Sequence, residues 1–135
     1  MIETLVDLLF NSGAITDREK VIESVIDREK QVGTGVGFGV AIPHAEPGLF
    51  SEPLAAFGRL VKPVDFHAPD GKKVNLVFLL LTPEKTPALH VRLLARICRL
   101  TRSQYLRNRL LRVATPKEAA KIIAEMETDY PELIP

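Results

Sequence analysis

The sequence contains no tryptophan and a single cysteine, Cys98. A lone cysteine cannot close a disulfide within the chain, which suits a reducing compartment. No apolar run approaches the roughly 20 residues that a membrane-spanning helix needs, and no basic segment followed by a short apolar run opens the chain. We therefore expect a cytoplasmic protein that inserts no segment into a membrane.

The chain also lacks an excess of charge of either sign. It has 18 lysines and arginines against 17 aspartates and glutamates, which leaves a net charge of +1. This balance gives no global indication of binding to nucleic acid or to an anionic membrane. Hydrophobic residues make up 46% and charged residues 26% of the 135 residues, as in an ordinary globular domain. We expect one domain, residues 1–135, that is large enough to bury a core.

Apolar periodicity predicts helices at both ends of the chain and strands in the middle. Helical spacing occurs in five segments, at about residues 1–13, 16–31, 86–100, 103–111 and 115–127. Strands are predicted at 54–60 and 74–81, and 36–42 is predicted to be a glycine-loosened strand or a bulged loop. The continuous apolar run at 74–81 is typical of a central strand covered on both faces. The pattern predicts an α/β fold in which a mixed β-sheet is flanked by helices on both faces.

Four residues have the sequence context of helix N-caps. Thr16 with Glu19 and Thr115 with Glu118 match the capping box, Thr86 precedes a proline at the first helical position, and Ser103 precedes a further helical segment. We expect four helices to begin at these caps.

The segment from Gly33 to Gly48 places a histidine directly after a proline. Glycines at every second position leave one side of an extended chain bare, which permits close approach of another backbone or of an oxyanion. Pro43 fixes its own φ and favours an extended Ile42, so His44 follows a stiff strand end. Imidazole is largely neutral at pH 7, and a neutral imidazole is a competent nucleophile toward phosphorus. His44 is therefore either an ordinary loop residue or a residue presented to a reacting partner.

Two further residues are candidates for contacts with a phosphoryl group at His44. Arg28 lies in the last turn of the helical segment that leads into the glycines, and His90 lies near the start of the helical segment after the strand at 74–81. Such strand ends and helix starts commonly build anion sites. Each residue also has a structural interpretation. Arg28 is then a surface cation near a helix C-terminus, and His90 a partly buried histidine bonded to the backbone.

Three stretches of the sequence resemble a known family. They are REKQVGTGVGFGVAIPHA at 28–45, GRLVKPVDFHAPDGKKVNLVFLLLTPE at 58–84 and HVRLLARICRL at 90–100. They are similar to the fructose/mannitol-type EIIA domains of the bacterial phosphoenolpyruvate:sugar phosphotransferase system, and especially to the nitrogen-regulatory EIIA proteins. The resemblance covers most of the chain, from Leu5 to Met126.

The resemblance implies a phosphohistidine carrier with a mixed β-sheet flanked by helices. By correspondence of residues, His44 accepts the phosphoryl group, His90 contacts it, and Arg28 lies near the active histidine. The implied donor is a phosphohistidine of an HPr-like phosphocarrier protein. The group then passes to an EIIB domain or serves as a regulatory signal to a target protein, and neither a cofactor nor a metal is implied. The alternative function is a non-phosphorylated regulatory or binding module that uses the same fold to dock partner proteins.

The chain departs from the family pattern at three places. It begins almost inside the first expected helix, where family members usually carry an amino-terminal strand. Either the sheet lacks this first edge strand or the chain is a trimmed domain. Phe38 stands where a small polar residue is more usual, and His67 where an acidic residue is usual. We expect Phe38 to change the shape of the surface that docks the donor.

Two rival functions also follow from the residues. The three histidines and Cys98 supply zinc-ligand types, but no pair of them has the short spacing of a structural metal site. A stretch without acidic residues, 85–116, carries an arginine stripe at helical spacing. Its members are Arg92, Arg96, Arg99 and Arg102. Aromatic residues are almost absent there, so we interpret the stripe first as a solvated face, then as a docking surface for an acidic or phosphorylated protein, and last as a nucleic-acid site.

Overall fold

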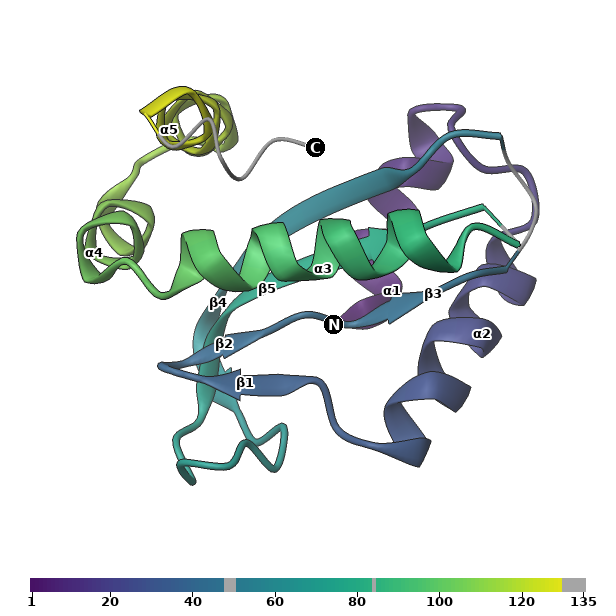
Figure 1. The fold of residues 1–135 in the computed structure, drawn as a ribbon, viewed down its shortest axis with the longest axis horizontal. Coiled ribbons are helices and arrows are strands. Elements are labelled where there is room, and N and C mark those ends of the chain that lie inside the picture. Colours follow the sequence, from purple (N-terminus) through teal and green to yellow (C-terminus); the bar gives the residue numbers. More distant parts are fainter. Residues whose placement is uncertain (48–50, 84, 130–135) are drawn as a thin grey trace. The chain divides into compact units, whose positions relative to one another are not determined.

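The computed structural model describes residues 1–47, 51–83 and 85–129, which form two compact units that meet between His90 and Val91 in the sequence. The first unit contains α1 (Ile2–Asn11), α2 (Arg18–Gln31), β1 (Gly35–Gly37), β2 (Val40–Ala41), β3 (His44–Ala45), β4 (Leu54–Val64) and β5 (Val74–Leu81) (Figure 1). The helix α3 (Pro87–Thr101) begins in the first unit and continues into the second, which also contains α4 (Gln104–Arg112) and α5 (Pro116–Asp129). The predicted α/β class is confirmed, since the described residues combine five helices with a mixed sheet. The single domain of residues 1–135 stays a prediction.

The sheet is built around β5, which has strands on both sides (Figure 1). The long strand β4 runs antiparallel to it. The short strands β2 and β3 run parallel to it on the other side, with Val40 opposite Leu76 and His44 opposite Leu80. They form one strand interrupted at Pro43, because proline has no backbone N–H to donate. In the described residues no strand precedes α1, and β4 has β5 as its one neighbour in the sheet.

The segment 36–42 is not a single strand but lies in a hairpin. Strands β1 and β2 pair antiparallel around a turn at Phe38 and Gly39, whose φ angles are 61° and 77°. Positive φ at both central residues is the mark of a type I′ turn. The carboxylate of Asp70 accepts a hydrogen bond from the Phe38 N–H at 2.9 Å, which supports the conformation that phenylalanine tolerates poorly. The prediction missed this turn because the glycines recur at the period of a strand.

The close approach that the glycines predict is confirmed on the side of β1. A Cβ on Gly35 would lie 3.0 Å from the Cβ of Ala68 and 3.2 Å from the Cβ of Phe66. One on Gly33 would lie 2.9 Å from the carbonyl oxygen of Phe66. Glycine at these positions therefore lets the segment around Phe66 pack directly on the backbone of β1.

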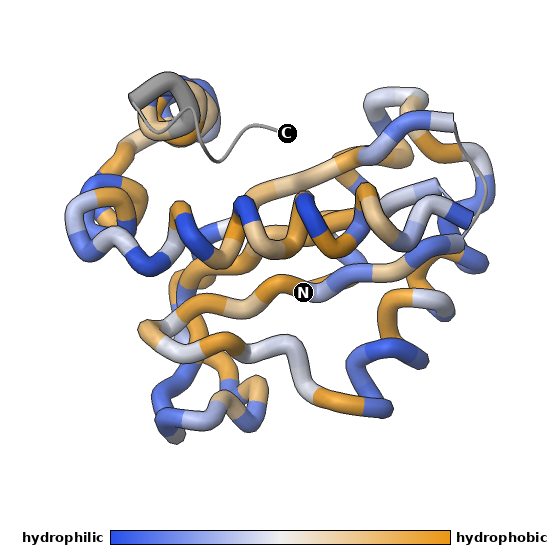
Figure 2. Tube along the Cα trace, in the orientation of Figure 1, coloured by the Kyte–Doolittle hydropathy of each residue, from blue (hydrophilic) through white to orange (hydrophobic). Residues whose placement is uncertain are grey.

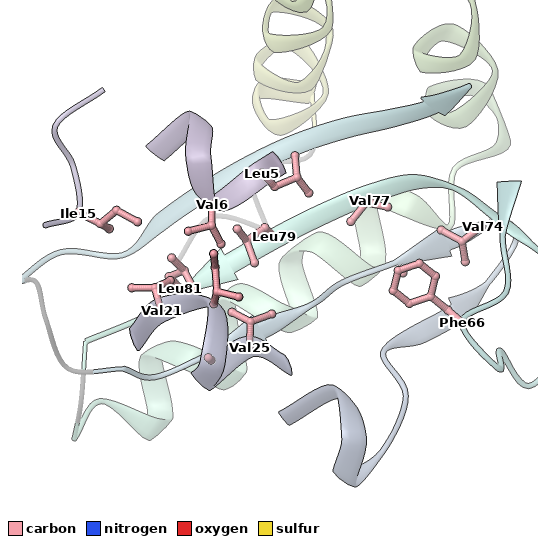
Figure 3. Packing of buried hydrophobic residues seen from close by; sticks show 13 residues of the cluster. Leu5, Val6, Ile15, Val21, Val25, Phe66, Val74, Val77, Leu79 and Leu81 are labelled. Atoms are coloured by element: carbon pink, nitrogen blue, oxygen red, sulfur yellow. The ribbon is translucent and has the colours of Figure 1, made fainter. Parts of the chain in front are cut away.

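The helices α1 and α2 share a hydrophobic core with one face of the sheet (Figure 3). The helices contribute Leu5, Val6, Val21, Ile22 and Val25, and β5 contributes Val77, Leu79 and Leu81. The alternate side chains of β5 are buried as well, and Phe78 packs against Phe57 of β4 with the ring centroids 4.9 Å apart. Figure 2 shows β5 as a largely apolar segment. The prediction of a central strand at 74–81 is confirmed with the same bounds.

Two of the four predicted helix caps are confirmed by side-chain hydrogen bonds. The hydroxyls of Ser103 and Thr115 each accept a main-chain N–H bond of 3.2 Å at the start of α4 and α5. Helix α3 begins at Pro87, directly after Thr86 as predicted, while the Thr86 hydroxyl donates to the Pro83 carbonyl at 2.6 Å. The prediction of Thr16 is wrong, because α2 is capped by the side chain of the next residue, Asp17. A carboxylate both accepts the first N–H bonds and interacts with the positive end of the helix dipole. None of the helices in the described residues is long and apolar enough to cross a membrane.

Candidate functional site

The candidate site lies where two parallel strands end. Strands β3 and β5 are parallel, so their carboxyl ends meet at one edge of the sheet. The main-chain N–H of Leu80 donates to the Pro43 carbonyl at 2.9 Å, and that of Thr82 donates to the Ala45 carbonyl at 3.1 Å. Main-chain hydrogen bonds of the residues before and after His44 therefore fix its position relative to the end of β5.

The two candidate histidines are in contact. The ring centroids of His44 and His90 lie 5.1 Å apart, with the ring planes inclined at 56°. His44 is half-buried in β3, and His90, in the first turn of α3, is 8% exposed. Strand β3 and helix α3 thus bring together two imidazoles that are far apart in the sequence.

The hydrogen bond of His44 determines which of its ring nitrogens keeps a lone pair. Its Nδ1 lies 2.7 Å from the carbonyl oxygen of Ile42. A carbonyl only accepts, so in the neutral ring Nδ1 carries the hydrogen and Nε2 keeps its lone pair. Burial lowers the pKa of His44, and the positive charge of Arg28 lowers it further, against opposing contributions from the Ile42 carbonyl and Glu29. In the neutral ring, Nε2 is therefore the nitrogen with an available lone pair.

His90 is held by side chains rather than by the backbone. Its Nδ1 lies 2.5 Å from the hydroxyl of Thr82 and 3.7 Å from a carboxylate oxygen of Glu46. Burial lowers the pKa of His90, Arg28 lowers it further, and Glu46 raises it. Because Nδ1 faces Thr82, Nε2 is the nitrogen that remains for a ligand.

The surroundings of Arg28 are compatible with both interpretations of this residue, a cation near a helix C-terminus and a positive group close to His44. Its guanidinium donates to the carbonyl of Val32, just beyond the end of α2, at 3.0 Å. Its charge also lowers the pKa of His44 and of His90, so its electrostatic field extends to both rings. A guanidinium has five N–H donors, and the bond to Val32 uses one of them.

Sequence reasoning missed three polar residues around these histidines. Thr82 and Glu46 directly follow β5 and β3, and a polar residue at the carboxyl end of a buried strand was the available signal. Glu29 accepts bonds of 3.0 Å from the main-chain N–H and from the hydroxyl of Thr34. Its carboxylate therefore fixes the connection between α2 and β1, beside Arg28.

The histidines considered for a metal site and the arginines considered for a nucleic-acid site lie in different parts of the described chain. In the three ranges that the structure covers, no three His, Cys, Asp or Glu side chains are grouped so that they could hold a metal ion. His67 is exposed, with Nδ1 3.8 Å from a carboxylate oxygen of Asp65. In the second unit, Arg92, Arg99 and Arg102 of the stripe are exposed, whereas Arg96 is half-buried. Figure 2 shows hydrophilic segments recurring along α3.

Folding stability should decrease as the pH falls from about 7.5 to about 5.5. Burial keeps the pKa of His44 and of His90 below the ordinary value of 6.5. The unfolded chain therefore binds protons in this range that the folded chain does not bind, and the free energy of unfolding falls with the pH until the lowered pKa values are passed. Urea titrations across this range measure the effect. The double variant His44→Asn, His90→Gln serves as the control, and an equal slope in both proteins would contradict the prediction.

Three comparisons relate the chain to known proteins. Residues 1–126 match the family described as "Phosphoenolpyruvate-dependent sugar phosphotransferase system, EIIA 2". The chain is 41% identical over 110 residues to a nitrogen regulatory protein of Bradyrhizobium diazoefficiens, covering 80% of this chain and 72% of the relative. It is 34% identical over 125 residues to a fructose-specific EIIA component of Haloferax volcanii, covering 93% and 81%. The crystal structure of the nitrogen regulatory protein IIA-Ntr from Neisseria meningitidis superposes with a TM-score of 0.81 at 35% identity, covering 90% of this chain and 82% of the other.

Proposed function

Because the chain belongs to the EIIA 2 family of the phosphoenolpyruvate-dependent sugar phosphotransferase system, we propose that it carries a phosphoryl group on Nε2 of His44. The observation that carries this proposal is the 2.7 Å contact between His44 Nδ1 and the Ile42 carbonyl. It leaves Nε2 with a free lone pair on a ring whose pKa is lowered by burial. A neutral nitrogen presented in a fixed orientation is what nucleophilic attack on phosphorus requires.

The donor is a phosphohistidine on an HPr-like phosphocarrier protein. The lone pair of His44 Nε2 forms the new bond to phosphorus, the phosphorus–nitrogen bond of the donor breaks, and its electron pair returns to the donor imidazole. The ring of His44 gains positive charge in this step. The Ile42 carbonyl stabilises that charge because it accepts the Nδ1–H bond.

His90 and Arg28 stabilise the transferred group. Phosphoryl transfer needs chiefly positioning and positive or donor groups around the phosphoryl oxygens. His90, whose ring lies against that of His44, supplies an N–H from Nε2. Arg28 supplies positive charge and further N–H donors from the end of α2.

The phosphorylated chain, acting in the cytoplasm as one domain, passes the group to an EIIB domain or signals through it to a target protein. The regulatory role is favoured, because the chain is 41% identical to a nitrogen regulatory protein and 34% identical to a fructose-specific component. No cofactor enters this scheme, since the donor brings the phosphoryl group and the ring nitrogen provides the electrons.

The test is phosphoryl transfer to the wild-type protein. It is incubated with phosphoenolpyruvate, the general phosphotransferase enzyme and an HPr-type carrier of either the sugar or the nitrogen branch. We expect an acid-labile gain of one phosphoryl group, located on His44 by peptide mass spectrometry. If neither carrier labels a folded protein, the proposal fails and the non-phosphorylated binding module takes its place.

A further inference from the structure

Thr82 is a buried polar residue beside the two candidate histidines, and it was not among the site residues predicted from the sequence. It directly follows β5, its side chain is 0% exposed, and its main-chain N–H donates to the Ala45 carbonyl. Its hydroxyl oxygen lies 2.5 Å from Nδ1 of His90. A hydroxyl removed from water needs a hydrogen-bond partner, and this nitrogen is the partner the fold provides.

The direction of this hydrogen bond decides what His90 offers at its other nitrogen. A hydroxyl can donate or accept, and a neutral imidazole carries one N–H. If the hydroxyl donates, Nδ1 is the acceptor and Nε2 carries the hydrogen. If it accepts from Nδ1–H, then Nε2 has a lone pair, which repels the oxygens of a phosphoryl group.

We infer that the Thr82 hydroxyl donates to Nδ1 and so holds neutral His90 in the tautomer with hydrogen on Nε2. This inference rests on the proposed function, in which His90 donates to the phosphoryl group on His44. Thr82 is then a positioning residue, because it acts through His90 and does not touch the transferred group. Main-chain pairing of the ends of β3 and β5 keeps its hydroxyl in register with the reacting histidine.

Glu46 favours the other tautomer of His90, with hydrogen on Nδ1. A carboxylate favours a hydrogen on Nδ1, and this one lies 3.7 Å away, which is beyond hydrogen-bond distance. Its side chain is also about one-third exposed, so water weakens its effect. In the described part of the chain, Arg28 and the ring of His44 also lie near His90. A guanidinium has no acceptor atom, and Nδ1 of His90 is already within hydrogen-bond distance of the Thr82 hydroxyl. The short hydrogen bond from Thr82 therefore outweighs the Glu46 carboxylate and determines the tautomer of His90 as long as the hydroxyl is present.

The experiment measures the tautomer of His90 directly. Protein labelled with ¹⁵N in histidine gives ring-nitrogen chemical shifts that separate a protonated from an unprotonated nitrogen, and the His90 signals are assigned by their loss in His90→Gln. In the wild type we expect hydrogen on Nε2. In Thr82→Val, which keeps the shape and removes the hydroxyl, we expect a shift toward hydrogen on Nδ1. Thr82→Ser, which keeps the hydroxyl, should resemble the wild type.

Transfer rates provide the second readout. We expect transfer from a phosphorylated HPr-type carrier to slow roughly 2- to 10-fold in Thr82→Val, the worth of one hydrogen bond, and to recover in Thr82→Ser. Hydrogen on Nδ1 in the wild type would overturn the inference without any variant. So would an unchanged tautomer in a folded Thr82→Val, even if transfer slowed. Absence of labelling on wild-type His44 would contradict the proposed function instead, and the tautomer measured in the unphosphorylated protein would still decide the inference.

Discussion

His44→Asn is expected to abolish phosphoryl acceptance while the fold is retained. The asparagine amide nitrogen takes the place of Nδ1 and can keep the bond to the Ile42 carbonyl, so the end of β3 loses little structure. The variant has no ring nitrogen with a lone pair, and without a nucleophile the phosphorus has no acceptor. Labelling from phosphoenolpyruvate through the general enzyme and an HPr-type carrier should fall to background, measured by intact mass.

The matched control for this variant is His67→Asn. His67 is 88% exposed in its side chain and has a φ of 53°, a left-handed conformation that asparagine tolerates well. The control should therefore fold and accept the phosphoryl group as the wild type does. Labelling of folded His44→Asn at the wild-type rate would move the acceptor away from His44.

Leu79→Ala is expected to lower the free energy of unfolding by about 2–5 kcal/mol. Leu79 is fully buried in the middle of β5, and Figure 3 shows its side chain in the core beside Val6 of α1. Truncation removes buried apolar surface and leaves a cavity that the surrounding strand and helices fill only in part. Urea unfolding followed by circular dichroism measures the change.

The control for the core variant is Leu8→Ala. Leu8 lies on α1 with 55% of its surface exposed, and alanine favours helix, so this change should stay within about 0.5 kcal/mol. A loss in Leu79→Ala no greater than in Leu8→Ala would mean that β5 is not the centre of the core.

The elements predicted best were those with strong local signals. The strand at 74–81 was predicted with its observed bounds, because a continuous apolar run lies between a turn at Asp70 and Pro83. The caps at Ser103 and Thr115 were also local, since a hydroxyl there needs only the following turn of helix. The hairpin at Phe38 was missed, because the glycines recur at the period of a strand and the Asp70 carboxylate that supports the turn is far away in the sequence.

The sequence by itself determined the reactive candidates: a histidine after a stiff Ile-Pro step, a second histidine at a helix start, and an arginine at a helix end. Only the tertiary structure decided that the rings of His44 and His90 touch, and that Thr82 and Glu46 face the same nitrogen of His90. The physical reason is that residue type and local spacing govern chemistry and helix or strand formation. Contacts and tautomers depend on the register of β3 against β5, which is set by hydrogen bonds between segments distant in the sequence.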